Sequence, residues 1–224
     1  MTIAMASMRK YRLVVFDWDG TLVDSAGHIV HSIQSAAHDL DLPVPPDADA
    51  SHIIGLGLID AMEYLFPGVP VDRYAQVADR YRHHYVSGAG VVKLFPGVAE
   101  GLEHLRSKGR LLAVATGKSR RGLDQALAET GLEQHFDATR CGDEGFSKPH
   151  PDMLEYLFGE LDVERDAALM VGDTTHDLDM AKAARIDALA VAYGAHQGTS
   201  LRGSNPIACL DTPGELWRWL DENA

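Results

Sequence analysis

Two aspartates, Asp17 and Asp19, stand one residue apart directly after the apolar run 13–16, and Gly20 and Thr21 follow them. The apolar run is typical of a buried strand, in which residues two apart point to the same side. Both carboxylates can therefore face one reacting centre, while the glycine lets the chain turn sharply away. Two buried carboxylates this close are costly unless a cation lies between them. The pattern fits a nucleophile beside an acid or base, with a divalent cation that reduces their repulsion; an ordinary acidic turn is the alternative.

Polar residues also follow apolar runs elsewhere in the chain. The run 111–115 leads into Thr-Gly-Lys at 116–118, and the run 167–171 leads into Gly-Asp at 172–173. A Lys-Pro-His-Pro-Asp segment begins at Lys148, between these two runs. Continuous apolar runs are typical of parallel strands that are buried on both faces. Ligands of such sheets bind beyond the carboxyl ends of the strands, so the sequence predicts one site at that edge.

These four segments resemble motifs one to four of the haloacid dehalogenase superfamily of phosphohydrolases. They occur in the family's order between Asp17 and Asp177, and no departure from its catalytic pattern is found. The pairing of Asp-x-Asp-Gly-Thr with a later Gly-Asp-x-x-x-Asp is the most specific part of the match. Within the superfamily the chain is most similar to the phosphoglycolate phosphatase-like branch. The resemblance implies a Mg²⁺-dependent phosphatase that works through an aspartyl-phosphate.

The resemblance assigns different roles to the paired aspartates. Asp17 is the expected nucleophile, whose carboxylate attacks phosphorus. Asp19 is expected to protonate the departing alkoxide and then to deprotonate the hydrolytic water, which requires a protonated Asp19 when substrate binds. Dehalogenases of this family lack the second aspartate, so its presence favours phosphoryl chemistry.

A metal site is expected at the same edge, and Mg²⁺ is the expected ion because it prefers oxygen ligands. The expected ligands are the Asp17 and Asp173 carboxylates and the backbone carbonyl of Asp19. Asp177 is expected to bind the ion through water or to orient Lys148. Capping of the following helix is the alternative role for Asp173 and Asp177.

The phosphate is expected to bind at the ends of the first two runs. Thr116 and Lys148 are also predicted catalytic residues, because the hydroxyl reaches a phosphoryl oxygen and the ammonium neutralises both Asp17 and the phosphoryl group. The other basic side chains nearby, Lys118, Arg120 and Arg121, are expected to be exposed. Whether His28, His31 or Arg120 contacts substrate stays open, and His176 receives no role. The predicted phosphate-binding residues are Gly20, Thr21, Thr116, Gly117 and Lys148.

Composition narrows the class of protein. The 224 residues carry a net charge of −13, which argues against nucleic-acid and anionic-membrane binding. Cys141 and Cys209 have no metal-site spacing and are expected to be free thiols in a reducing compartment. No apolar run approaches the roughly eighteen residues of a membrane helix, and no signal-peptide pattern opens the chain. A cytoplasmic monomer or homodimer is expected.

Strand-like and helical patterns alternate along the chain outside residues 23–92. Residues 1–22 and 93–224 are predicted to form a doubly wound, Rossmann-like α/β core with a parallel sheet. Residues 23–92 are predicted to be an all-helical insertion, the small cap of the resembled family, with hinges at 23–25 and 91–94 and a pliable return at Gly88 and Gly90. The predicted helices are 25–40, 58–65, 72–85, one opening at 96–98, 119–130, 152–161, 177–184 and 211–220. The predicted strands include 136–139 and 188–193.

The cap is expected to decide the substrate. Residues 23–92 contain no lysine, which excludes the related phosphonate hydrolases because these need a cap lysine for a Schiff base. Residues 54–58, Ile-Gly-Leu-Gly-Leu, resemble the family's specificity loop, although a flexible connection is the alternative. A small phosphorylated metabolite such as 2-phosphoglycolate is the expected substrate. A phosphosugar mutase of the β-phosphoglucomutase type, a pyrophosphate or nucleotide monophosphate hydrolase, and a catalytically silent phosphate-binding protein stay open.

Overall fold

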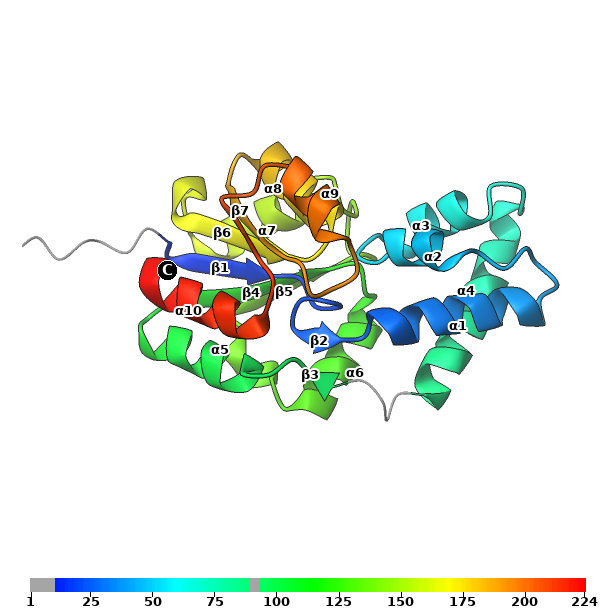
Figure 1. The fold of residues 1–224 in the computed structure, drawn as a ribbon, viewed down its shortest axis with the longest axis horizontal. Helices are drawn as coiled ribbons and strands as arrows, with labels where there is room; N and C mark the ends of the chain where they lie inside the picture. The colour runs from blue at the N-terminus through cyan, green and yellow to red at the C-terminus, as the bar shows by residue number, and fades with distance from the viewer. Residues whose placement is uncertain (1–10, 89–92) are drawn as a thin grey trace, which may run out of the picture.

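A six-stranded parallel sheet forms the centre of the computed structural model, which describes residues 11–88 and 93–224 (Figure 1). The strand order is β5-β4-β1-β6-β7-β8, so the chain winds outward in both directions from β1. Phe16 in β1 lies opposite Val114 on one side and Val171 on the other. The predicted doubly wound parallel sheet is therefore confirmed. The strands are β1 Leu13–Phe16, β4 Leu111–Thr116, β5 Ala138–Cys141, β6 Ala168–Gly172, β7 Asp187–Val191 and β8 Ala208–Leu210.

Helices cover both faces of this sheet. Val14 and Phe16 point into the core under α5, α6 and α10, whereas Leu13 and Val15 point into the core under α7 and α8. Because neither face of β1 or β6 meets water, these two central strands contain no charged or polar side chain, which explains their continuous apolar runs in the sequence. These helices are α5 Val98–Ser107, α6 Arg120–Thr130, α7 Asp152–Leu161, α8 Thr175–Ala184 and α10 Pro213–Asn223, with the short α9 Gly198–Gly203 beside β7.

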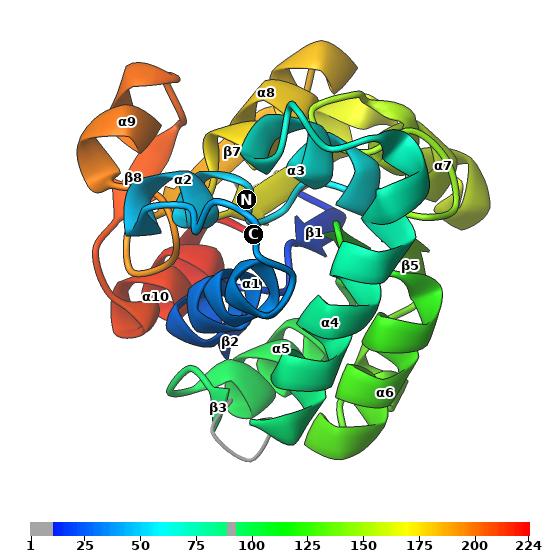
Figure 2. The ribbon, with the colours of Figure 1, turned by 90° about the vertical axis from the view of Figure 1, so that its right-hand side faces the viewer.

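The segment between β1 and β4 contributes helices that pack around an apolar cluster of their own. Ile29 and Ile33 of α1, Met62 of α3 and Val77 of α4 belong to this cluster. Helices α1 and α4 lie side by side along their length, beyond the carboxyl end of β1 (Figure 2). The helical cap is thus present, while the predicted domain limits at 22 and 93 stay a prediction. Its elements are α1 Ala26–Asp39, α2 Asp47–His52, α3 Leu58–Leu65, the short 3₁₀ helix Val71–Arg73 and α4 Tyr74–Ser87.

The structure differs from the sequence predictions in a few short elements. The insertion is not wholly helical, because β2 Val23–Asp24 pairs antiparallel with β3 Lys93–Leu94 where the chain crosses between cap and core. Helices α2 and α9 and strand β8 were not predicted, and β5 begins at Ala138, two residues later than expected. Part of the second hinge and Gly90 lie outside the described residues. No helix within 11–88 and 93–224 has the length and apolar character to cross a bilayer.

Candidate active site

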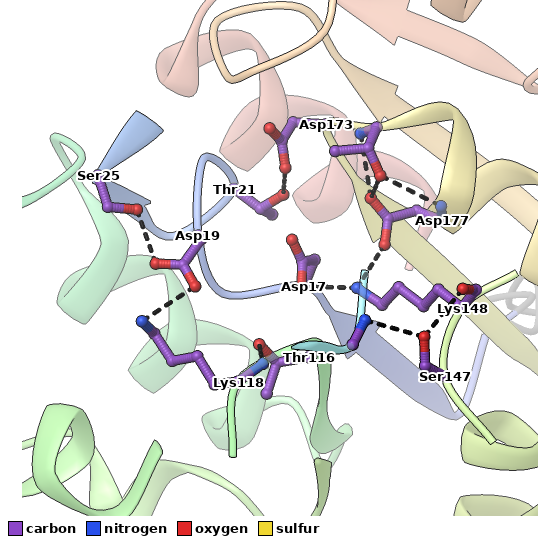
Figure 3. A network of polar contacts seen from close by, with 12 residues as sticks. Asp17, Asp19, Thr21, Ser25, Thr116, Lys118, Ser147, Lys148, Asp173 and Asp177 are labelled. Carbon is purple, nitrogen blue, oxygen red and sulfur yellow. Dashed lines mark hydrogen bonds and ion pairs between the residues drawn. The ribbon is translucent and has the colours of Figure 1, made fainter. Parts of the chain in front are cut away.

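The predicted catalytic side chains meet at the carboxyl edge of the sheet (Figure 3). Asp17 directly follows β1, Thr116 ends β4 and Asp173 directly follows β6. The backbone N–H of Asp17 donates to the carbonyl of Val171 at 2.9 Å. The hydrogen bonding between β1 and β6 therefore fixes the backbone position of Asp17. Asp17 is 1% exposed and Asp173 is fully buried. Segments more than 150 residues apart in sequence therefore build one buried site.

Lys148 is a buried ammonium that bridges two carboxylates. Its Nζ lies 2.6 Å from Oδ1 of Asp17 and 2.6 Å from Oδ1 of Asp177. Burial alone would lower the pKa of Lys148, but the two carboxylates outweigh it and raise the pKa above the ordinary lysine value. The lysine is thus held as a cation beside the expected nucleophile.

Negative charge still exceeds positive charge around this lysine. One oxygen each of Asp17, Asp173 and Asp177 lies within 4.8 Å of the others. Three ionised carboxylates and one ammonium leave two negative charges in a buried space. Burial, opposed by Lys148, raises the pKa of Asp17 to about 7, and burial together with the Asp17 charge raises the pKa of Asp173. Among the described residues none donates a hydrogen bond to Oδ2 of Asp17, so the donor set fits a hard divalent cation.

Asp173 is held in place by the loops that follow β1 and β7. The Thr21 hydroxyl donates to Oδ1 of Asp173 at 2.8 Å, and the Ala195 N–H donates to Oδ2 at 2.7 Å. Gly20 has a φ of 81°, and a Cβ at this position would lie 2.1 Å from Oδ2 of Asp173. Gly20 and Thr21 were predicted to bind phosphate; in the structure both contact this carboxylate instead, and their phosphate role stays a prediction.

Asp177 combines two of the roles that the sequence left open. Its Oδ2 accepts the Thr174 N–H at 3.0 Å and the Thr174 hydroxyl at 2.7 Å, which completes a capping box at the start of α8. Its Oδ1 holds Lys148. Because Oδ1 of Asp177 already holds a cation and Oδ2 accepts two hydrogen bonds, the geometry favours orientation of the lysine, and metal binding by Asp177 stays a prediction.

Asp19 lies on the other side of Asp17, and both of its oxygens are also engaged. The Ser25 hydroxyl donates to Oδ1 at 2.7 Å, and the Lys118 ammonium lies 3.1 Å from Oδ2. The prediction that Lys118 is exposed is wrong, because its side chain is only 11% exposed. Its neighbour Arg120 is directed instead to Glu144, at 2.9 Å.

The loop 54–58 of the cap lies directly on the core site. A Cβ on Gly117 would stand 2.4 Å from the carbonyl oxygen of Leu56, so only glycine allows this approach. The Gly57 N–H donates to the hydroxyl of Ser147, the residue before Lys148, at 2.9 Å. The loop predicted to select substrate thus contacts Gly117, a predicted phosphate-binding residue, and Ser147, which precedes the predicted phosphate-binding Lys148.

Histidines join the cap and the core next to the carboxylates. The Nε2 atoms of His176 and His196 lie 2.7 Å and 3.1 Å from the carbonyl oxygen of His52, at the end of α2. Because a carbonyl oxygen only accepts hydrogen bonds, the Nε2 atoms of His176 and His196 both carry protons. The two imidazoles thus satisfy the backbone carbonyl at the end of α2.

The two histidines of α1 do not face the carboxylates. His28 is directed to the Tyr85 carbonyl at 2.8 Å. His31 lines a cavity of about 380 Å³ between α1, α2 and the loop after β7. The predicted catalytic residues do not belong to the lining of this cavity.

Sequence reasoning missed Lys118, Ser25 and Ser147 as site residues. One signal was available for Lys118, because it follows Thr116 at the same two-residue offset by which Asp19 follows Asp17. No local pattern marks Ser147, whose partner Gly57 is 90 residues away.

Known proteins that are similar to this chain include hydrolases and phosphatases. A model of the family described as "Haloacid dehalogenase-like hydrolase" matches residues 14–191. "Probable phosphatase IndB" of Dickeya dadantii (strain 3937) is 36% identical over 210 residues, which are 91% of each chain. "Phosphoglycolate phosphatase" of Haemophilus influenzae (strain KW20 / Rd) is 32% identical over 218 residues, covering 92% of this chain and 97% of that one. A crystal structure of "a predicted phosphoglycolate phosphatase" from Haemophilus somnus 129pt has a TM-score of 0.82 at 26% identity and covers 95% of this chain and 99% of its own.

Proposed function

We propose that this chain, which belongs to the haloacid dehalogenase-like hydrolases and is a phosphatase, hydrolyses a small phosphate monoester. The proposed reaction passes through an aspartyl-phosphate on Asp17. The observation that carries the proposal is the state of the Asp17 carboxylate. One oxygen is fixed by the buried Lys148, and the other has no hydrogen-bond donor among the described residues. An oriented carboxylate with one free oxygen is suited to attack phosphorus in line.

The first step transfers the phosphoryl group to Asp17. A bond forms between its free oxygen and phosphorus while the bond from phosphorus to the ester oxygen breaks. Asp19 donates a proton to the departing alkoxide, and in the second step it takes a proton from the water that cleaves the aspartyl-phosphate. Lys148 and the Thr116 hydroxyl stabilise the charge on the phosphoryl oxygens during both steps.

The three-carboxylate cluster is the proposed Mg²⁺ site. Asp17, Asp173 and the backbone carbonyl of Asp19 are the proposed ligands, while Asp177 orients Lys148. The ion, when bound, supplies positive charge that offsets the repulsion between the carboxylates and the dianionic phosphate.

The proposed substrate is small and resembles phosphoglycolate. Two features support this proposal: a relative bears the name phosphoglycolate phosphatase, and the loop 54–58 closes directly over Gly117 and Ser147. We also propose a cytoplasmic location, which is consistent with the two free thiols Cys141 and Cys209.

Replacing the nucleophile tests the proposal. Asp17→Asn should lower phosphate release by at least about a thousandfold, as loss of a covalent catalyst does, while the circular dichroism spectrum stays native. The matched control is Asp166→Asn, which changes an exposed aspartate of the core and should leave turnover unaffected. Phosphate release would be measured over a panel of metabolite monoesters with Mg²⁺ and with a chelator. Substantial Asp17→Asn turnover, or activity that survives the chelator, would contradict the assignment.

A further inference from the structure

We propose that Ser147 of the core limits the size of the leaving group that the site accepts. Its hydroxyl caps helix α3 of the cap and thereby fastens the loop 54–58, so Ser147 is a positioning residue that acts through this loop. The inference rests on the proposed phosphatase function and deepens it, because it names a residue that determines specificity at the same site.

Helix α3 begins without a capping side chain of its own. Gly57 stands at its N-cap position in an extended conformation and has no side chain to accept the N–H groups of the first turn. A Cβ on Gly57 would lie 2.8 Å from Cβ and 3.0 Å from Oγ of Ser147. The serine of the core therefore occupies the space that a capping side chain of the helix itself would fill.

The Ser147 hydroxyl makes two hydrogen bonds to this end of the helix. Its oxygen accepts the Gly57 N–H at 2.9 Å, and its proton is donated to Oδ2 of Asp60 at 2.7 Å. The Lys148 carbonyl, at 3.1 Å, is the more distant acceptor for the same proton. Asp60 is the third residue of α3, and in a capping box the carboxylate at this position accepts the N-cap N–H directly. Here the serine hydroxyl lies between the two groups, so the box is complete only while the loop lies against the core.

The bond to Ser147 is what fastens the loop to the core. A second contact, between the Leu56 carbonyl and the backbone at Gly117, is a packing contact that limits how near the loop can come. Within residues 11–88 and 93–224, the bond from the loop to Ser147 is the one hydrogen bond that joins the loop 54–58 to the core. Ser147 also lies beside Lys148 (Figure 3). Loss of its hydroxyl therefore frees the loop next to the expected phosphate-binding lysine.

A fixed loop fixes the space above the nucleophile. Asp17 is 1% exposed, so a phosphate ester that reaches it lies beneath the cap, and its leaving group must fit the space that the cap leaves. A small leaving group fits without moving the loop. A large one displaces the loop outward and breaks the bond to Ser147, and the loss of this bond discriminates against it.

The test compares ethyl phosphate with phenyl phosphate, whose uncharged leaving groups differ in size. Ser147→Ala should lower the ratio of kcat/KM for ethyl over phenyl phosphate by about tenfold, the effect of losing one helix cap, because only the larger ester broke that bond. A general loss of stability does not change the ratio, since both esters start from the same free enzyme. Their different intrinsic reactivities cancel between variants. Ser200→Ala, at an exposed serine of α9, is the matched control and should leave the ratio unchanged.

Asp60→Ala tests the relay through the hydroxyl. Without this carboxylate the serine proton turns to the Lys148 carbonyl and the capping box is broken, so the ratio should fall as well. Because the two side chains act as one unit, the ratio in the double variant Ser147→Ala with Asp60→Ala should fall no further than in Ser147→Ala alone. Effects that multiply in the double variant would show that Asp60 acts without the hydroxyl, and they would overturn the inference.

A binding measurement separates this inference from the proposed function. In the Asp17→Asn background, calorimetry of the same two esters should show the preference for ethyl over phenyl phosphate falling about tenfold when Ser147→Ala is added. If neither ester releases phosphate but this fall persists, the phosphatase proposal fails and the size limit stands. If the wild type hydrolyses both esters and Ser147→Ala leaves their ratio unchanged in turnover and in binding, the phosphatase proposal stands and the inference is overturned.

Discussion

Charge around Lys148 determines what each carboxylate of the site can do. The ammonium is shared between Asp17 and Asp177, and the latter also caps α8 through Thr174. Oδ2 of Asp177 accepts two hydrogen bonds and Oδ1 already holds an ammonium, which would repel a metal ion bound there, whereas each oxygen of Asp173 accepts one hydrogen bond from an uncharged donor. We therefore propose that Asp177 positions Lys148, which pairs with one oxygen of Asp17 and leaves the other free for the proposed attack on phosphorus.

Asp177→Asn separates positioning from metal binding. The amide can keep its oxygen towards Thr174, but its NH₂ then faces Lys148 and repels it, so kcat should fall by about 10- to 100-fold. The Mg²⁺ concentration for half-maximal activity should change little, because no ligand is lost. Asp179→Asn, an exposed aspartate on the same helix, is the control and should behave as the wild type. A tenfold rise in the Mg²⁺ requirement would identify Asp177 as a ligand instead.

Sequence reasoning located the residues of this site that follow predicted strands and missed those that depend on distant partners. Asp17, Thr116 and Asp173 each stand where an apolar run ends, and a parallel sheet brings such ends together. Lys118 was predicted to be exposed because lysines usually are. Its burial depends on Asp19 and on Tyr85 of α4. The two-residue offset from Thr116 indicates the first contact, but no pattern local to Lys118 indicates the second.

Among the helices and strands, the long and strongly apolar ones were predicted correctly, and the short ones were missed. Strands β1, β4 and β6 are buried on both faces, so their apolar runs were unmistakable. Helix α9 contains a single buried apolar residue, Leu201, and β8 has only three residues, so neither produces a periodic signal. The two-residue strand β2 exists only because β3 lies beside it, 70 residues later in the chain.

Two glycine-to-alanine changes test how the cap loop meets the core. In Gly117→Ala the new Cβ would lie 2.4 Å from the Leu56 carbonyl and 2.6 Å from the Gly55 carbonyl, which are backbone atoms that cannot simply rotate away. The loop must shift, at a cost of roughly 1–3 kcal/mol typical of overpacking. We expect kcat/KM to fall by about tenfold or more, measured on the best ester of the panel.

The control is Gly159→Ala on α7, where a Cβ meets nothing within 4 Å. Because alanine favours helix, this change should raise the free energy of unfolding by roughly 0.5–1 kcal/mol and leave kcat/KM unchanged. Unchanged activity in Gly117→Ala would show that the loop does not need to contact the core during catalysis.

For the whole molecule, the main electrostatic problem is a surface of net charge −13 around a site that must accept a phosphate dianion. The sheet adds to this problem, since it gathers three carboxylates at one buried edge. Lys148 offsets one of those charges, and Lys118 is already paired with Asp19. The fold therefore carries a buried excess of negative charge that destabilises the protein until a cation binds.

Asp173→Asn should for that reason have opposite effects on stability with and without Mg²⁺. Asparagine can keep both contacts of the side chain, its oxygen accepting from the Ala195 N–H and its NH₂ donating to the Thr21 hydroxyl. With a chelator the variant loses a repelling charge and should melt at the same temperature as the wild type or higher. With Mg²⁺ at about a hundredfold excess over its dissociation constant, the wild type should gain about 2.7 kcal/mol, which corresponds to a rise of roughly 5–10 °C, while the variant gains little. Melting curves would be measured for both proteins and for the control Asp166→Asn, which should respond to Mg²⁺ as the wild type does. An equal response of all three proteins to Mg²⁺ would show that the ion does not bind at Asp173.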